Sequence, residues 1–250
     1  MNTLVIDIGN TKICVGKYSS NGQIFFPKNF PTNENEEFIK QNLNQYMEID
    51  RVAIASVVPN LNRSFSKILD ELGFKDILWI NYEVNIGAKI DYPYLKEIGA
   101  DRLANTAEGF KRCNDKTSSS NVIICDFGTA LTFDVIHKKN GYIGGIISPG
   151  PNLMLSYLSD KTALLPNIEL STSLNNIGRS TQEAILIGAN KGFNGMVKEI
   201  ISGIEIEIGS SKKIFTGGFA SWFFKSTDIQ AEYDEFLTLR GIGVISELNK

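Results

Sequence analysis

Two short segments of the sequence place an acid among residues that form tight turns. Asp7 ends the apolar run LVI and precedes Gly9, Asn10 and Thr11, while Asp126 ends the run VIIC and precedes another glycine and threonine. Glycine and small polar residues at a strand end let backbone N–H groups converge on a phosphate. Because a carboxylate repels a phosphate unless a cation lies between them, the two acids predict a nucleotide bound with metal ions. Asp-x-Gly is also a common simple turn, but its repetition favours the phosphate site.

The segment GADR, residues 99–102, places an acid and a base at the start of an expected helix. Asp101 in this position is typical of a helix N-cap, and that alternative stays open. The helix N-terminus and the Arg102 guanidinium can also hold a carboxylate or a phosphate. The Asp101 carboxylate would then be placed to accept a proton from a substrate hydroxyl.

Two further segments have both a structural and a functional interpretation. The run TGG, residues 216–218, follows an apolar strand, where it forms either a strand-to-helix turn or a surface that a nucleoside can approach closely. Ser180 and Glu183 match the S-x-x-E capping box at the start of a long expected helix. The capping box accounts for Ser180 but not for Thr181, which it leaves displayed on the first turn.

The elements around these motifs repeat along the chain. LVIDIGNTKICVGKYSSNG and VIICDFGTALTFDVIHKKNG share an apolar strand, Asp-x-Gly and an alternating strand, and Asp126 follows Asp7 by 119 residues. This spacing, close to half of the 250 residues, indicates an internal duplication of one α/β unit. The polar segment 113–121 is the expected boundary between domains 1–115 and 116–250. We expect helices over 35–47, 62–72, 180–204 and 238–248 and from residue 101, and strands near 23–26 and over 51–59, 76–80 and 212–218.

Composition narrows the class of protein further. With 42% hydrophobic and 21% charged residues the chain has a globular composition, and its net charge of −3 makes nucleic acid an unexpected partner. Three cysteines without a CxxC pair and a single histidine argue against zinc and disulfides, as in a reducing cytosol. The amino terminus lacks a signal-peptide pattern, and no apolar run reaches membrane-spanning length. We therefore expect a soluble cytoplasmic protein with no membrane association.

The motifs DIGNT, GADR, DFGTA, GGIISPG and TGG, in this order, resemble those of type III pantothenate kinases over essentially the whole chain. These kinases belong to the superfamily of actin, heat-shock ATPases, and acetate and sugar kinases. The resemblance implies two ribonuclease-H-like α/β domains with mixed sheets flanked by helices and a nucleotide in the cleft between them. It also implies ATP-dependent phosphorylation of pantothenate to 4'-phosphopantothenate, the first step of coenzyme A biosynthesis. The implied cofactors are Mg²⁺ and a monovalent cation, potassium or ammonium, and the implied assembly is a homodimer.

The resemblance also implies roles for individual residues. Asp101 matches the general base and Asp126 the ligand of the monovalent cation. Thr181 matches a pantothenate contact that acts across a dimer interface. Tyr94 and Leu95 stand where the family has Asn-Pro, which leaves Tyr92 and Tyr94 as alternative substrate contacts. The implied nucleotide contacts are Asp7, Ile8, Gly9, Asn10, Thr11, Lys12, Ile13, Cys14 and Thr129. The implied substrate contacts are Tyr92, Gly99, Ala100, Asp101, Arg102 and Thr181.

Two alternative functions stay open at this point. One is a non-catalytic regulatory or accessory protein on the same scaffold, and the joint presence of Asp7, Asp101 and Asp126 beside their glycines argues against it. The other is a kinase of a different small hydroxy or carboxylate metabolite, because a scaffold does not fix its substrate.

Overall fold

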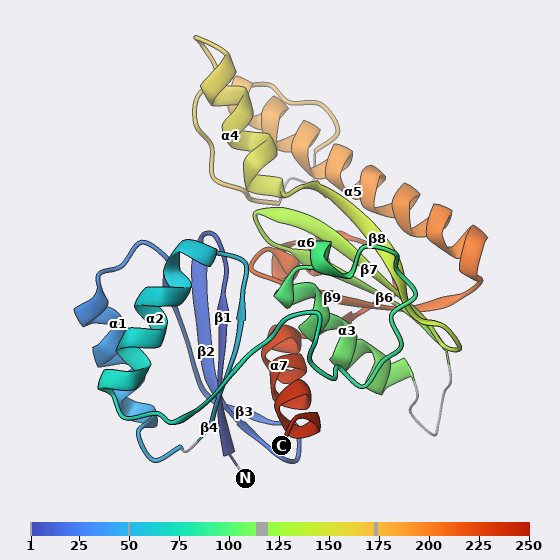
Figure 1. Cartoon of the computed structure of the whole chain (residues 1–250). Coiled ribbons are helices and arrows are strands. Elements are labelled where there is room, and N and C mark those ends of the chain that lie inside the picture. The colour runs from blue at the N-terminus through green and yellow to red at the C-terminus, as the bar shows by residue number, and fades with distance from the viewer. Residues whose placement is uncertain (1, 50, 114–119, 173–174) are drawn as a thin grey trace. The chain divides into compact units, whose positions relative to one another are not determined.

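Two mixed sheets of five strands each form the framework of the chain in its computed structural model (Figure 1). The structure describes residues 2–49, 51–113, 120–172 and 175–250. The chain divides into two compact units, of which the first consists of residues 1–115, 140–142 and 236–250. The second unit consists of residues 116–139 and 143–235.

The first sheet has the strand order β3-β2-β1-β4-β5. Its strands are β1 (Asn2–Ile8), β2 (Lys12–Ser19), β3 (Ile24–Pro31), β4 (Arg51–Ser56) and β5 (Asp76–Trp79). Strand β1 pairs antiparallel with β2 and parallel with β4, and β2 pairs antiparallel with β3. The near-continuous apolar sequences of β1 and β4 match strands that are buried on both faces.

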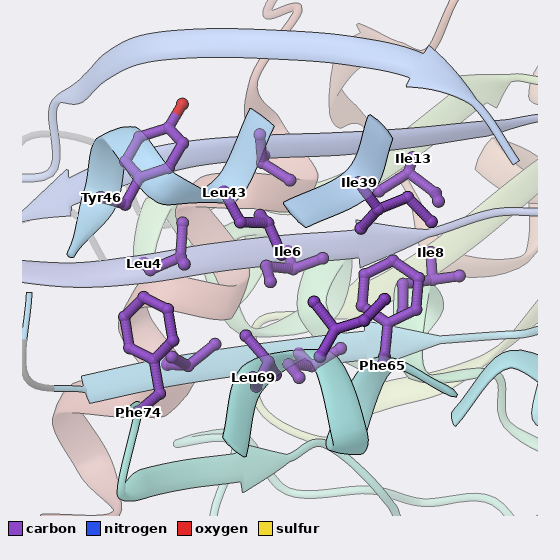
Figure 2. Packing of buried hydrophobic residues seen from close by; sticks show 14 of the residues in the cluster. Leu4, Ile6, Ile8, Ile13, Ile39, Leu43, Tyr46, Phe65, Leu69 and Phe74 are labelled. Carbon is purple, nitrogen blue, oxygen red and sulfur yellow. The ribbon is translucent and has the colours of Figure 1, made fainter. Parts of the chain in front are cut away.

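Helices cover both faces of the first sheet. Successive residues of a strand point to opposite sides, so the apolar residues of β1 contribute to a core on each face. Leu4, Ile6 and Ile8 of β1 pack with α1 (Glu36–Leu43) and α2 (Pro59–Glu71), as Figure 2 shows. Val5 belongs instead to the core formed with α3 and α7. These two helices are α3 (Ala100–Cys113) and α7 (Leu237–Leu248). The first sheet is therefore the middle layer of three.

Helix α7 packs closely on α3 and on the first sheet through two glycines. A Cβ atom on Gly241 would overlap the carbonyl oxygen of Ala104, and one on Gly243 would overlap the ring of Tyr18. Glycine at these two positions lets the helix backbone approach its neighbours without a side chain between them. The carboxyl end of the chain thus completes the core of the first unit.

The second sheet has the strand order β10-β9-β6-β7-β8. Its strands are β6 (Asn121–Phe127), β7 (Ala130–His137), β8 (Gly141–Pro149), β9 (Ser211–Thr216) and β10 (Glu232–Tyr233). The accompanying helices are α4 (Pro151–Lys161), α5 (Thr181–Ile208) and α6 (Ala220–Ser226). One face packs against α5 and α6 in an aromatic core, where the rings of Phe127 and Phe223 stack at 4.7 Å.

The two sheets repeat one topology, which confirms the predicted pair of similar halves. Strands β6, β7, β8, β9 and β10 occupy the positions of β1, β2, β3, β4 and β5, in the same order. Strand β6 pairs antiparallel with β7 and parallel with β9, as β1 does with β2 and β4. The shared order extends across all five strands, far beyond the single hairpin that the sequence pattern matched.

Some elements differ from the sequence-based expectations. Pro59 begins α2 instead of closing the preceding strand, because proline suits the first turn of a helix, where its missing N–H costs nothing. The strand expected near 23–26 continues to Pro31, and α4 was not expected at all. Of the expected boundary segment 113–121, residues 114–119 lie outside the described residues.

Candidate active site

The first acid-glycine turn joins β1 to β2. Asp7 is half-buried and lies opposite Cys14 in the hairpin, and the Gly9 amide donates to the Lys12 carbonyl at 3.0 Å. Thr32 fixes the turn from the end of β3, since its hydroxyl donates to the Gly9 carbonyl at 2.7 Å. Its amide also donates to the carbonyl of Thr11 at 3.1 Å. Thr32 thus stabilises the turn through two hydrogen bonds, while Asn10, Thr11 and Lys12 stay exposed.

The predicted nucleotide segment, residues 7–14, divides between the two faces of the sheet. Ile8 and Ile13 are fully buried, and Figure 2 shows their side chains in the core with Phe65 and Ile39. These two residues can offer only backbone atoms to a ligand. Asp7 has the parity of Val5, which lies on the opposite face, the one covered by α3 and α7.

The segment GADR lies beside the tip of β1. After β4 the chain turns so that the Val57 amide donates to the Ile8 carbonyl at 3.1 Å. A Cβ atom on Gly99 would stand 3.5 Å from Cγ1 of Val57 and would overlap Oδ1 of Asp101. Gly99 therefore leaves the space that the Asp101 carboxylate occupies at the start of α3. Val57 provides the connection between the first turn and this helix N-terminus.

Asp101 lies inside the first turn of α3. The helix is capped by Gly99, whose carbonyl accepts the first helical hydrogen bond from the Leu103 amide at 3.0 Å. Oδ1 of Asp101 accepts from the amide of Arg102 at 2.7 Å. Burial raises the pKa of the Asp101 carboxyl, and the hydrogen bond and charge of Arg102 only partly oppose this shift. A buried carboxylate with a raised pKa has the properties of a general base.

The ring of Tyr142 lies beside both Arg102 and Tyr92. The Arg102 guanidinium lies 5.8 Å from the ring centre of Tyr142, and the Tyr92 ring meets the Tyr142 ring edge-on at 5.9 Å. Tyr94, in contrast, is 62% exposed. Tyr92 is therefore the tyrosine that lies near GADR. Sequence reasoning missed Tyr142, because nothing in the run GYIGG distinguishes it from a core aromatic.

The second acid-glycine turn repeats the hydrogen bonds of the first. The Gly128 amide donates to the Ala130 carbonyl at 3.0 Å, as Gly9 does to Lys12. The Gly150 amide donates to Thr129 at 3.0 Å, which is the counterpart of the bond from Thr32 to Thr11. Phe219 donates to Phe127 at 3.0 Å, in the place of the bond from Val57 to Ile8. Asp126 is half-buried like Asp7, and Thr129 is exposed.

The TGG segment lies directly against Asp126. Thr216 pairs with Asp126 in the parallel ladder between β6 and β9. Gly217 has a φ of +95°, and a Cβ atom there would overlap Oδ1 of Asp126 and stand 2.7 Å from the amide nitrogen of Phe127. A Cβ atom on Gly150 would likewise overlap the carbonyl of Gly128. Gly217 thus lets one backbone segment approach the Asp126 carboxylate closely, and Gly150 lets another approach the turn that follows it.

Thr181 is the first residue of α5 and is exposed. The Ser180 hydroxyl accepts from the Glu183 amide at 3.2 Å, while the Glu183 carboxylate accepts from the Arg179 amide at 2.7 Å instead of from Ser180. This modified capping box leaves the Thr181 side chain beside a groove of about 560 Å³. The groove is lined by apolar residues of α4 and α5, among them Met154, Leu155, Leu158, Ala184 and Ile185.

The described residues offer carboxylates for metal binding, but no larger cluster of metal-binding side chains. None of their His, Cys, Asp and Glu side chains form a group of three or more suited to a metal ion. Mg²⁺ in nucleotide sites is commonly held by one or two carboxylates together with substrate phosphates. Asp7 or Asp126 fits such a site, in which a nucleotide would provide the remaining ligands. Across the same residues, the structure contains no helix with both the length and the hydrophobicity needed to span a membrane.

The strand order and the two turns define an actin-like ATPase fold, which solved structures share. One is a Campylobacter jejuni protein assigned to the Baf family of transcriptional activators, with a TM-score of 0.60, 21% identity, and 98% and 97% of the two chains covered. Another is a ROK family glucokinase from Streptomyces griseus in complex with glucose and AMPPNP, with a TM-score of 0.52, 13% identity, and 97% and 98% covered. These likenesses show the fold alone.

The sequence comparisons identify the family within this fold. The family model for type III pantothenate kinase matches residues 3–203. The type III pantothenate kinase of Methylacidiphilum infernorum is 36% identical, over 98% of this chain and 88% of that protein. The chain therefore belongs to the type III pantothenate kinase family, and the family expected from the motifs is confirmed.

Proposed function

We propose that this protein transfers the γ-phosphoryl group of ATP to the primary hydroxyl of pantothenate, forming 4'-phosphopantothenate for coenzyme A biosynthesis. The family match over residues 3–203 carries this proposal. The activity is that of a phosphotransferase with an alcohol acceptor, as the names of its relatives state.

Asp101 is the general base of this proposal. Its carboxylate accepts the proton of the acceptor hydroxyl while the hydroxyl oxygen bonds to the γ-phosphorus and the bond to the ADP oxygen breaks. Burial raises the pKa of Asp101, which makes its carboxylate a stronger base than an exposed one. Arg102 provides a bidentate donor for the pantothenate carboxylate, and Tyr92 lines the same region. Ala100 and Gly99 contribute backbone at the helix N-terminus.

Asp7 and the turn that follows it form the phosphate site of the first unit. Asn10 and Thr11 are exposed and Gly9 is half-buried, so the backbone of this turn is open to a phosphate. When ATP binds, Mg²⁺ would be held by Asp7 together with the phosphates and would neutralise their charge. The protein itself contributes orientation and backbone donors, which phosphoryl transfer chiefly requires.

Asp126 is the proposed ligand of the monovalent cation, potassium or ammonium. The support is steric: Gly217 and Gly150 leave backbone oxygens and the Asp126 carboxylate without intervening Cβ atoms. Oxygen ligands of this kind suit hard cations. Thr129, exposed on the same turn, is the proposed ATP contact.

A homodimer and a cytoplasmic location complete the proposal. Leu153 and Tyr157 on α4 expose 48% and 61% of their side chains, and nearby Leu164 exposes 92%. Exposed apolar side chains in one region are typical of interaction surfaces, and Thr181 lies beside this helix. Three cysteines without a CxxC pair, Cys14, Cys113 and Cys125, are in keeping with a reducing compartment.

The test is an assay of the purified protein with ATP, Mg²⁺, potassium and pantothenate. We expect mass spectrometry to detect 4'-phosphopantothenate and ADP in equal amounts. A parallel panel of glucose, N-acetylmannosamine and acetate tests other acceptors, and sodium in place of potassium tests the cation. A clear preference for a sugar or for acetate would overturn the pantothenate assignment. Absence of ATP turnover with every acceptor would favour an accessory protein on this scaffold.

A further inference from the structure

We infer that Tyr142 is a positioning residue for acceptor binding, because it fixes the Arg102 guanidinium and the Tyr92 ring beside Asp101. This inference deepens the proposed function and rests on it. Tyr142 lies far from GADR in the sequence and in none of the motifs that identify the family. Its role follows only from where the fold places it.

The backbone of Tyr142 is held firmly within the first unit. Its amide donates to the Lys89 carbonyl at 2.9 Å, and its carbonyl accepts from the Asp91 amide at 2.7 Å. These bonds accompany an isolated parallel bridge between Ile90 and Tyr142. Gly141, with a φ of +75°, makes this pairing possible, since a Cβ atom there would overlap the Lys89 carbonyl oxygen. The backbone position from which the Tyr142 ring extends is therefore fixed.

The ring of Tyr142 is 1% exposed and lies between two groups of the proposed acceptor site. The guanidinium of Arg102 is on one side at 5.8 Å, and the edge-on ring of Tyr92 is on another at 5.9 Å. The electron-rich face of a tyrosine attracts a guanidinium and limits its freedom. Residues 89–91, which pair with Tyr142, also lead directly into Tyr92. One residue thus orients both side chains proposed to bind the acceptor.

The geometry separates this role from ordinary core packing. Tyr46 is a suitable comparison, because it is also a buried tyrosine of the first unit, with 2% exposure. Figure 2 shows Tyr46 among apolar side chains in the core formed with α1 and α2, on the face of the sheet opposite α3. Tyr92 and Tyr142 belong instead to the core formed with α3 and α7. Loss of the ring at Tyr46 should therefore affect stability alone.

The test compares Tyr142→Leu, Tyr142→Phe and Tyr46→Leu with the wild type in steady-state kinetics and thermal unfolding. We expect Tyr142→Leu to raise the KM for pantothenate by roughly 10-fold, the scale of a desolvated cation–π contact, with the KM for ATP unchanged. Tyr142→Phe keeps the ring and should recover most of this loss. Tyr46→Leu should lower the Tm without raising the KM for pantothenate.

A double-mutant cycle with Arg102→Ala identifies the path of the effect. If Tyr142 acts through Arg102, Tyr142→Leu should raise the KM for pantothenate far less in the Arg102→Ala background. An equal rise in both backgrounds would overturn the inference. So would equal losses towards ATP and pantothenate, or a Tyr142→Phe variant as impaired as Tyr142→Leu.

The proposed function is judged separately, on the wild type. A wild-type protein that does not phosphorylate pantothenate contradicts the function, whatever the variants do. The cycle is then measured with the acceptor that the panel identifies, and an unchanged KM for that acceptor in Tyr142→Leu would overturn the role of Tyr142.

Discussion

The two acid-glycine turns have the same backbone hydrogen bonds and different surroundings. Asp7 and Asp126 end equivalent strands, and each turn is closed by an amide that follows the third strand of its sheet. Beyond the fourth strand the two halves differ. In the first unit, Ala55 pairs with Asp7, and the amide that bonds back to β1 belongs to Val57, two residues later. In the second unit, Thr216 pairs with Asp126, and the equivalent amide belongs to Phe219, three residues later.

This difference changes what lies against each acid. In the second unit, with its longer turn, Gly217 lies against the Asp126 carboxylate. In the first unit the Val57 side chain lies next to Gly99, so that the start of α3 is beside the turn. The duplicated framework provides two phosphate turns, and the segment after the fourth strand gives each its own chemistry. In the first unit, this places Asp101, whose pKa is raised by burial, beside the phosphate turn.

The largest expected effect is that of Asp101→Asn, which removes the proposed general base of the first unit. We expect kcat to fall by roughly 10²- to 10⁴-fold, the usual contribution of a general base. Asp70→Asn, at an exposed surface pair, is the control and should keep full activity. An active Asp101→Asn enzyme would contradict the assignment of the base.

The same variant has a stability signature. Because the pKa of Asp101 is raised above 3.8 in the folded protein, the folded state holds this proton more firmly than the unfolded state does. The contribution of Asp101 to the free energy of unfolding therefore declines as the pH rises from 3.8 through the raised pKa. Asp101→Asn should remove that decline and raise the Tm at neutral pH relative to wild type, as measured by calorimetry across this range.

An intermediate effect is expected from Asp7→Asn and Asp126→Asn, which compare the equivalent acids directly. Asp7→Asn should increase the Mg²⁺ concentration needed for half-maximal activity by roughly 10-fold or more, since it weakens the only protein carboxylate proposed for that ion. Asp126→Asn should instead abolish the stimulation by potassium. Titrations of each variant with both cations measure this, and identical responses would show that the two turns do not bind different ions.

The smallest expected effect is that of Gly217→Ala, which tests the close approach of Gly217 to Asp126 in the second turn. Its Cβ atom would meet Asp126 and the Phe127 backbone, so we expect a roughly 10-fold weaker response to potassium and ATP in addition to a lower Tm. Gly73→Ala is the matched control, because Gly73 also has a positive φ, +86°, but a Cβ atom there meets nothing within 4 Å. It should lose about 1–2 kcal/mol of stability from backbone strain and no activity. Equal kinetic losses in both variants would exclude a specific role for Gly217.

The sequence determined the parts of the site that are local. The turns at Asp7 and Asp126 and the helix start at Asp101 depend on residues within a few positions of each other, and their types follow from backbone conformation and hydrogen bonding. The repeated pattern was also visible, because a strand and its hairpin are contiguous. These features sufficed to predict two similar halves and the family.

Only the tertiary structure decided how segments distant in the sequence complete these motifs. Gly217 against Asp126, Val57 against Gly99, and Tyr142 beside Arg102 each join residues whose positions depend on strand order and register across a whole sheet. A glycine or tyrosine in an apolar run has the same local pattern whether it faces a core or a site. These contacts depend on close packing between segments, and the packing partners are fixed only when the chain has folded.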